Sequence, residues 1–570
     1  MKHVLCGALA LLFLSGCSNE IANNSGKARQ TPVGTSPSIA GTSADPTTGL
    51  PVPVASTSDT APIATDAPPV VIAAGEPGPT ALRRLTNDEY RNSVKDLLLL
   101  AAAPTDPLLP DSLQFGYENF ASVHTVPPVL ASQYATAAAR VALEANIAAL
   151  APCATPASHG DCATTFINDF GKRVQRRPLA SSETTAYRAV YDVARATGTY
   201  EEGVRLVLET MLQSPFFLYR TEYGDAGAKR TLSSYEVASE LSYFLLGSTP
   251  DAELLRAADS NSLGSATEIE AQARRLLALP SAQASVRKFL AQWFGTTGVA
   301  SLKKDMTAFP TFDGAKSAML GSANMLLDTV VWQGEGTLRG LLLAPYTFAN
   351  TALAPIYGIP DPGQGDALVK VTVNPAERAG ILSTPALLSV VAHPSDSGPI
   401  ARGKYIRTRM FCQALPPPPP NVVITVPAAD PTLTTRERFA RHTSDPACAG
   451  CHSLIDPVGF GLENYDAIGA FRTSENGHPV DSQGALSGTD VDGPFSGGTE
   501  LANKLAASAT MRQCAVLNAA RWAFGRSEIE TDRLVATTLE KQLGSTGMDV
   551  RELLVALAKT DSFRERTLQP

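Results

Sequence analysis

Apolar residues recur at helical spacing along most of this chain, and this periodicity limits its fold more than any other feature. Tyr90, Val94 and Leu97 lie three or four residues apart, as they would on one face of an amphipathic helix. Thr86 or Asn87 precedes them and can cap the N-terminus of the helix. The pattern therefore predicts a helix in this stretch.

Other helical stretches are bounded by residues that interrupt helices. Gly247 follows one stretch and Pro280 divides two others. Strand-like alternation is scarce, and its clearest example is ALVKVTV at residues 367–373. Because strand-like alternation is scarce, we predict a mainly α-helical fold. Because 570 residues exceed what one hydrophobic core usually serves, we expect a multi-domain array of small helical domains that includes a cytochrome-c-like C-x-x-C-H helix.

The first residues have the pattern of an export signal. Lys2 precedes an apolar run from Val4 to Leu14, which is too short to span a membrane as a mature helix. The run ends in Leu-Ser-Gly-Cys, which resembles the bacterial lipobox, so we predict that Cys17 is lipidated and anchors the chain to a membrane. Ser18 favours an outer-membrane lipoprotein of the cell envelope that faces the periplasm or the surface. The alternative is an ordinary secretory signal with a chance cysteine.

Composition divides the rest of the chain. From Ser18 to about residue 80 it is rich in Ser, Thr, Pro and Ala and has no aromatic residue, which predicts a disordered tether. The five prolines Pro416 to Pro420 predict a stiff, extended spacer. The predicted segments are a lipoprotein signal peptide at 1–17, the tether at 18–80, helical domains at 81–150, 163–225, 230–365 and 485–570, and a C-x-x-C-H (haem-binding) domain at 376–475.

Six cysteines remain outside the signal peptide and the lipid site. An export compartment is oxidising, so we expect them to be paired or ligated. If the C-x-x-C-H pair binds haem, four are left: Cys153 and Cys162 would close a short loop, and by elimination Cys412 and Cys514 would join distant segments. The alternative is a buried free thiol among these four.

The stretch DPACAGCHSLIDPVG contains the chemically most informative motif. Asp445 and Pro446 match an N-cap residue and a proline at the first helical position, so we predict a short helix over PACAGCHSLI that ends at SLIDPVG. Cys448, Cys451 and His452 then share one face of the helix. The two thiols can form thioethers to one covalent haem c, and the imidazole can bind its iron.

The motif has two other interpretations. A structural zinc site needs four ligands, and no second Cys or His pair follows at ligand spacing. A Cys448–Cys451 disulfide remains the stronger rival, although a thioredoxin-like βαβ setting is missing. For the sixth ligand of a haem, His393 is the first choice and Met511 the alternative. Further candidates are His442, His478 and Met410.

Other function classes find less support. The chain has 47 basic and 55 acidic residues and no long basic run, which argues against nucleic acid as its main partner. It has no H-E-x-x-H, P-loop or G-x-S-x-G motif. Asp456, Glu463 and Asp466 lie close to the C-x-x-C-H segment, and we interpret them as capping or fold-holding groups rather than an acid–base pair.

Several motifs together resemble a known family. They include RRPLASSE, MLQSPFFLYRTE, GPIARGKYIRTRMFCQALPPPPP, DPACAGCHSLIDPVGFGLENYDAIGAFR and RWAFGR, in unbroken order from about Ala81 onward. This set resembles the planctomycete-cytochrome-associated family of exported multi-domain proteins of unknown function. The resemblance implies a c-type-cytochrome-like protein, with haem carried by Cys448, Cys451 and His452. It also suggests a second exported protein as partner, and it brings no established enzymatic activity.

The sequence therefore predicts an exported, lipid-anchored c-type haem protein that transfers single electrons in the cell envelope, with an exported redox partner. One alternative is a haem enzyme of the peroxidase or oxygenase kind. The other is a non-redox surface binding or scaffold protein in which Cys448 and Cys451 form a disulfide.

Overall fold

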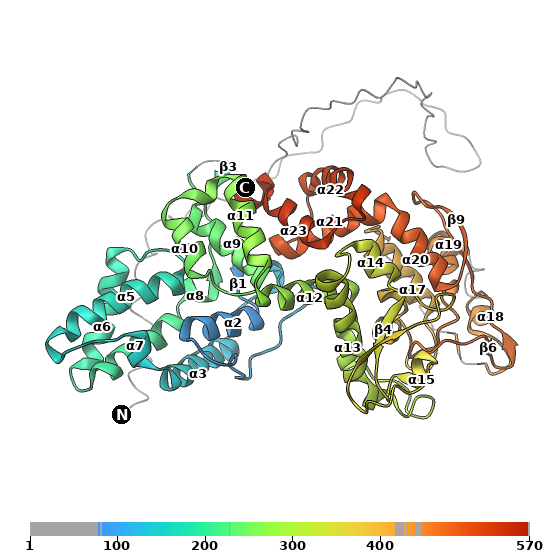
Figure 1. The fold of residues 1–570 in the computed structure, drawn as a ribbon, viewed down its shortest axis with the longest axis horizontal. Coiled ribbons are helices and arrows are strands. Elements are labelled where there is room, and N and C mark those ends of the chain that lie inside the picture. Colours follow the sequence, from blue (N-terminus) through green and yellow to red (C-terminus); the bar gives the residue numbers. More distant parts are fainter. Residues whose placement is uncertain are drawn as a thin grey trace, which may run out of the picture. The chain divides into compact units, whose positions relative to one another are not determined.

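A computed structural model describes residues 78–79, 82–226, 229–415, 427–428, 430–440 and 446–567 (Figure 1). By its contacts the chain divides into Met1–Val70 and Val71–Pro570, and every described residue belongs to the second unit. The predicted signal peptide, lipid site Cys17, tether up to residue 77 and pentaproline spacer lie outside the described residues. Within the described ranges, no helix combines the length and apolar character needed to cross a membrane.

The fold is mainly helical, as predicted, and its first region shows why. Thr86 caps the first helix: its Oγ1 accepts from Glu89 N at 3.2 Å, and Glu89 Oε2 accepts from Thr86 N at 2.8 Å. The predicted face of Tyr90, Val94 and Leu97 is buried. The elements of this region are β1 (Arg83–Arg84), α2 (Asn87–Leu98), α3 (Pro128–Glu144), α4 (Ile147–Leu150), α5 (His159–Gln175), α6 (Ser181–Arg195), α7 (Tyr200–Leu212), α8 (Pro215–Leu218) and β2 (Tyr219–Arg220).

The middle region confirms the predicted helix breaks and the predicted strand. Gly247 caps the C-terminus of α9 with φ 62°, a left-handed conformation that favours glycine, and Pro280 is the first residue of α12. Residues 369–372 of ALVKVTV form β5, antiparallel to β4. The elements are β3 (Lys229–Thr231), α9 (Ser234–Leu246), α10 (Ala252–Asp259), α11 (Ala266–Leu277), α12 (Pro280–Phe294), α13 (Phe312–Asp328), π-helix η5 (Thr329–Gln333), α14 (Leu338–Leu343), β4 (Tyr346–Ala349), α15 (Ala354–Tyr357) and β5 (Val369–Thr372).

The region around the C-x-x-C-H segment combines helices with two small hairpins. Strands β6 and β7 pair antiparallel, as do β8 and β9. With two to four residues each, these strands are too short to leave an alternating pattern in the sequence. The elements are α16 (Pro385–Val390), α17 (Pro399–Tyr405), π-helix η7 (Ile406–Met410), α18 (Thr435–Ala440), α19 (Pro446–Phe460), β6 (Ser474–Glu475), β7 (His478–Pro479), β8 (Gln483–Leu486) and β9 (Gly493–Ser496).

The last region returns to the middle of the chain. Strand β10 pairs antiparallel with β3, so Arg566 lies opposite Arg230. The elements are α20 (Gly497–Ala507), α21 (Ala509–Phe524), α22 (Glu530–Leu543), α23 (Val550–Ala558), α24 (Asp561–Arg564) and β10 (Glu565–Thr567). Short 3-10 helices are η1 (Ala121–Val123), η2 (Pro156–Ser158), η3 (Ser262–Gly264), η4 (Thr296–Ser301), η6 (Ile381–Ser383) and η9 (Gly544–Thr546).

Two disulfides confirm the predicted cysteine pairing. Cys153 and Cys162 are bonded, with Cα atoms 5.7 Å apart. Cys153 precedes α5 and Cys162 lies in its first turn, so the bond closes the loop that leads into this helix. Cys412 and Cys514 are bonded, with Cα atoms 5.3 Å apart. The second disulfide joins the segment after η7 to α21, across 102 positions of sequence.

Five buried charged side chains bring distant parts of the chain together. We call Arg83, Arg220, Glu222, Glu240 and Arg566 the interdomain charge cluster; none of these side chains is more than 6% exposed. Arg83 donates to Glu240 at 2.5 Å, and Arg220 pairs with the same carboxylate. Arg566 donates to Glu222 through two nitrogens, at 2.6 and 2.8 Å. The cluster thus connects β1, β2, α9 and β10.

Candidate functional site

Helix α19 carries the C-x-x-C-H motif and is longer than the sequence predicts. It runs from Pro446 to Phe460, so the expectation that SLIDPVG ends the helix was wrong. Pro457 lies inside it and cannot donate a backbone hydrogen bond. The carbonyl left without this bond is that of Ser453. Arg407 of η7 donates through Nε to the adjacent Leu454 carbonyl at 2.9 Å and ties this turn of α19 to η7.

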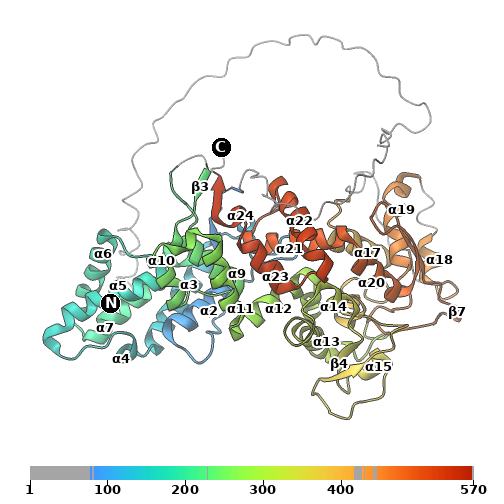
Figure 2. The ribbon, with the colours of Figure 1, turned by 45° about the horizontal axis from the view of Figure 1, so that its top comes forward.

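The continuation of α19 is also held by a close approach to α17, which packs against it (Figure 2). A Cβ atom on Gly459 would lie 1.8 Å from the Pro399 carbonyl oxygen. A Cβ atom on Gly403 would lie 2.0 Å from the Ile455 carbonyl oxygen. The backbones of the two helices therefore touch at positions where only glycine fits. Packing at this crossing keeps the helix intact through Pro457.

His452 has a defined partner on the same helix. Its Nδ1 lies 2.9 Å from Oδ1 of Asp456, one turn further along. The histidine side chain is 18% exposed and the carboxylate 5%. An ionised carboxylate can only accept, so Nδ1 carries the proton and the lone pair of the neutral imidazole is on Nε2. This is the tautomer that a metal-binding histidine needs when it binds through Nε2.

The residues present fit a haem ligand set as far as the structure describes them. On α19, Cys448 lies one turn before His452, and Cys451 immediately precedes it. The side chains of both cysteines fall outside the described residues. Gly450 is exposed, and Leu454 is 37% exposed. This end of α19 thus combines an oriented imidazole with accessible neighbouring residues, which is compatible with a haem ligand.

The predicted sixth ligands lie in different settings. The ring of His393 stacks on Phe439 of α18 at 6.3 Å, and burial lowers the pKa of His393 below its usual range. Met511 is fully buried in α21, and Met410 is buried in η7. His478 is exposed on β7, and His442 lies outside the described residues. Iron ligation by any of them stays a prediction, and among the described residues no cluster of three His, Cys, Asp or Glu side chains could hold a metal.

A second group of charged side chains, two of them buried and two partly buried, fixes the turn after α19. We call Arg402, Glu463, Arg472 and Glu475 the site-side charge cluster. Glu463 accepts from Ser397 Oγ at 2.7 Å and pairs with Arg472 at 3.1 Å. Arg402, fully buried, lies 3.8 Å from Glu463 and donates to three backbone carbonyls. Burial raises the pKa of Glu463 despite these arginines.

Sequence reasoning identified the fold-holding carboxylates but missed the role of one. Asp466 accepts from the backbone of Ile468 and Ala470, and Glu463 belongs to the site-side charge cluster, as expected of such groups. Asp456 instead holds His452. The available signal was the four-residue spacing on a helix. That signal was lost because the helix was expected to end before Asp456.

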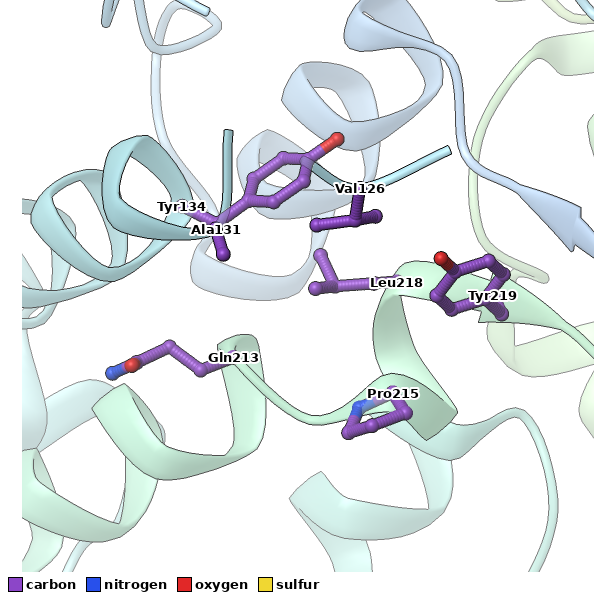
Figure 3. Close-up of a pocket in the computed structure, with 7 residues that line it drawn as sticks. All are labelled: Val126, Ala131, Tyr134, Gln213, Pro215, Leu218 and Tyr219. Atoms are coloured by element: carbon purple, nitrogen blue, oxygen red, sulfur yellow. The ribbon is translucent and has the colours of Figure 1, made fainter. Parts of the chain in front are cut away.

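A separate cavity of about 280 Å³ lies between α3 and the α7–α8 turn (Figure 3). Its lining is mostly apolar, and Tyr134 also accepts a hydrogen bond from Arg84 at 2.6 Å. The lining residues are Val126, Ala131, Tyr134, Gln213, Pro215, Leu218 and Tyr219. None of them belongs to α19, so this cavity is distinct from the candidate site.

Fold and family comparison together define the class. The described structure is that of a mainly helical protein built from several small domains. Five family models match the chain in order, each described as a protein of unknown function: DUF1587 at residues 83–146, DUF1595 at 162–222, DUF1592 at 232–359, DUF1588 at 378–475 and DUF1585 at 492–563. The chain belongs to the planctomycete-cytochrome-associated family that carries these domains. No curated protein and no solved structure matches it.

Proposed function

We propose that this protein is an exported, lipid-anchored c-type haem protein that transfers single electrons in the cell envelope. The observation that carries the proposal is the 2.9 Å contact between His452 Nδ1 and the buried Asp456, on the helix that bears the C-x-x-C-H motif. The DUF1588 model, named PSCyt3, covers this segment and supports the same interpretation.

Each residue of the motif has a defined task in this proposal. Cys448 and Cys451 would hold the haem through thioethers, and His452 would bind its iron through Nε2. Bound haem would supply reversible one-electron chemistry. The fold supplies a rigid support, because α19 is packed against α17 through Gly403 and Gly459.

The test is a pyridine haemochrome spectrum of the mature chain, produced in an export host with cytochrome c maturation machinery. A c-type α band that survives acid-acetone extraction is expected, and it should be absent from Cys448→Ala/Cys451→Ala. A colourless, folded wild type with a Cys448–Cys451 disulfide would overturn the proposal and favour a non-redox binding protein.

Membrane attachment needs a separate test because it rests on the lipobox alone. The wild type is expected in the membrane fraction and Cys17→Ser in the soluble fraction of the envelope, since acylation supplies the anchor. Equal distribution of the two forms would contradict lipid anchoring at Cys17 and leave the haem proposal intact.

A further inference from the structure

Asp456 is placed to control the ligand that His452 offers to iron. Its carboxylate is 5% exposed and contacts His452 Nδ1 at 2.9 Å. Both residues lie on α19, so the helix itself sets their separation. A backbone carbonyl that accepted from Nδ1 would present only a dipole to the histidine. The Asp456 carboxylate presents a full negative charge.

We propose that Asp456 is a positioning residue that holds His452 in the Nδ1–H tautomer and favours the ferric state of a haem bound there. This inference rests on the proposed function. The hydrogen bond fixes the plane of the ring and raises the basicity of Nε2. A buried carboxylate behind the ligand stabilises the more positive iron, because charges interact strongly where water is excluded.

Specific contacts with neighbouring elements keep Asp456 on the same helix as His452. If α19 ended before Pro457, Asp456 would leave the helix face that His452 occupies. Two features prevent that end: Arg407 binds the Leu454 carbonyl, and Gly459 lets the backbone of α19 rest on Pro399. The continuation of the helix past its proline is therefore what brings the carboxylate to the histidine.

The test compares reduction midpoints of the haem-loaded full chain. Asp456→Asn keeps an oxygen that can accept from Nδ1 and removes the charge. We expect it to be at least tenfold easier to reduce than the wild type, which for one electron is a 59 mV higher midpoint. Asp481→Asn is the matched control, because it removes the same charge from a side chain that is 54% exposed and pairs with Arg436.

Asp456→Ala separates position from charge. Loss of the acceptor should free the ring, so we expect a changed iron–histidine vibration in its resonance Raman spectrum, with Asp456→Asn closer to the wild type. If Asp456→Asn accumulates without haem, haem loading of Asp456→Glu distinguishes a positioning role of Asp456 from a role in folding. Haem loading restored by that carboxylate would support positioning, whereas haem-free protein from both variants would mean that Asp456 serves folding alone and would overturn the inference.

The failures of the two proposals are distinguishable. A wild type without covalent haem overturns the proposed function and this inference with it. The second outcome concerns haem-loaded protein. If Asp456→Asn shifts the reduction midpoint of the wild type by no more than Asp481→Asn does, the inference alone is overturned.

Discussion

The interdomain and the site-side charge clusters both place carboxylates among arginines, but they differ in the span of sequence that they join. In the interdomain cluster, burial would raise the pKa of Glu222, but Arg566, Arg83 and Arg220 outweigh it and lower that pKa. Burial prevails at Glu240 of the same cluster and at Glu463 of the site-side cluster, where the pKa of each carboxyl is raised. In the first cluster the paired residues Glu222 and Arg566 are 344 positions apart, whereas Glu463 and Arg472 are nine apart. Ion pairs thus serve long-range assembly in the first cluster and local shaping of the chain in the second.

The sharpest way to break this comparison is Glu240→Gln. It removes one of the two carboxylates that the buried Arg83 and Arg220 share and leaves them only Glu222. We expect the free energy of unfolding to fall by about 3–5 kcal/mol, the usual cost of breaking a buried ion pair. Urea denaturation followed by circular dichroism measures it. Glu552→Gln, whose side chain is 45% exposed, is the control and should cost less than about 1 kcal/mol. Equal losses would show that the cluster does not hold the fold.

A covalent link sharpens the comparison next, because Cys412–Cys514 joins the site region to α21. Its removal in Cys412→Ala/Cys514→Ala should cost about 2–4 kcal/mol, chiefly by freeing the unfolded chain. Cys153→Ala/Cys162→Ala should cost less, since that loop spans 9 positions rather than 102. The same denaturation experiment tests both, and a larger loss from the short loop would refute the ranking.

The helix crossing at the site offers a smaller effect. Gly459→Ala places a methyl group against the Pro399 carbonyl, so we expect a loss of about 1–3 kcal/mol from overpacking. Gly450→Ala is a matched control on the same helix, because a Cβ there meets nothing within 4 Å. That change should be neutral or slightly stabilising. Thermal melts of the two variants would contradict the proposed crossing if they coincided.

The smallest expected effect is a pH dependence of opposite sign at Glu463 and at Glu222. The folded chain holds the Glu463 proton to higher pH than the unfolded chain, whose carboxyl has a pKa near 4.5. Stability from this group is present below that value and is lost as pH rises through the folded pKa. Relative to Glu463→Gln, the wild type should therefore lose stability as pH rises from about 4.5, by at most about 1 kcal/mol per pH unit. Glu222→Gln should show the reverse, with wild-type stability lost as pH falls. Denaturation curves at a series of pH values distinguish the two.

Local rules predicted much of this fold, and tertiary contacts account for what they missed. Thr86, Gly247 and Pro280 act where their chemistry predicts, because caps and breaks depend on a few neighbouring residues. Pro457 does not end α19, because Arg407 and the contact with α17 outweigh the local preference. The role of Asp456 was missed for the same reason. The interdomain charge cluster was out of reach, since no periodicity relates Arg83 to Arg566.

The interdomain charge cluster also bears on how the protein comes to fold. Arg83 donates to the carbonyl of Ala523, which lies 440 positions later in the sequence. Glu222 pairs with Arg566, which lies 344 positions later. During vectorial synthesis, Glu222 and Glu240 emerge after Arg83 and Arg220 but long before Arg566, the third arginine that pairs with them. Completion of this core is therefore a late event, and a chain stalled before β10 would present Glu222 and Glu240 with an incomplete set of counter-charges.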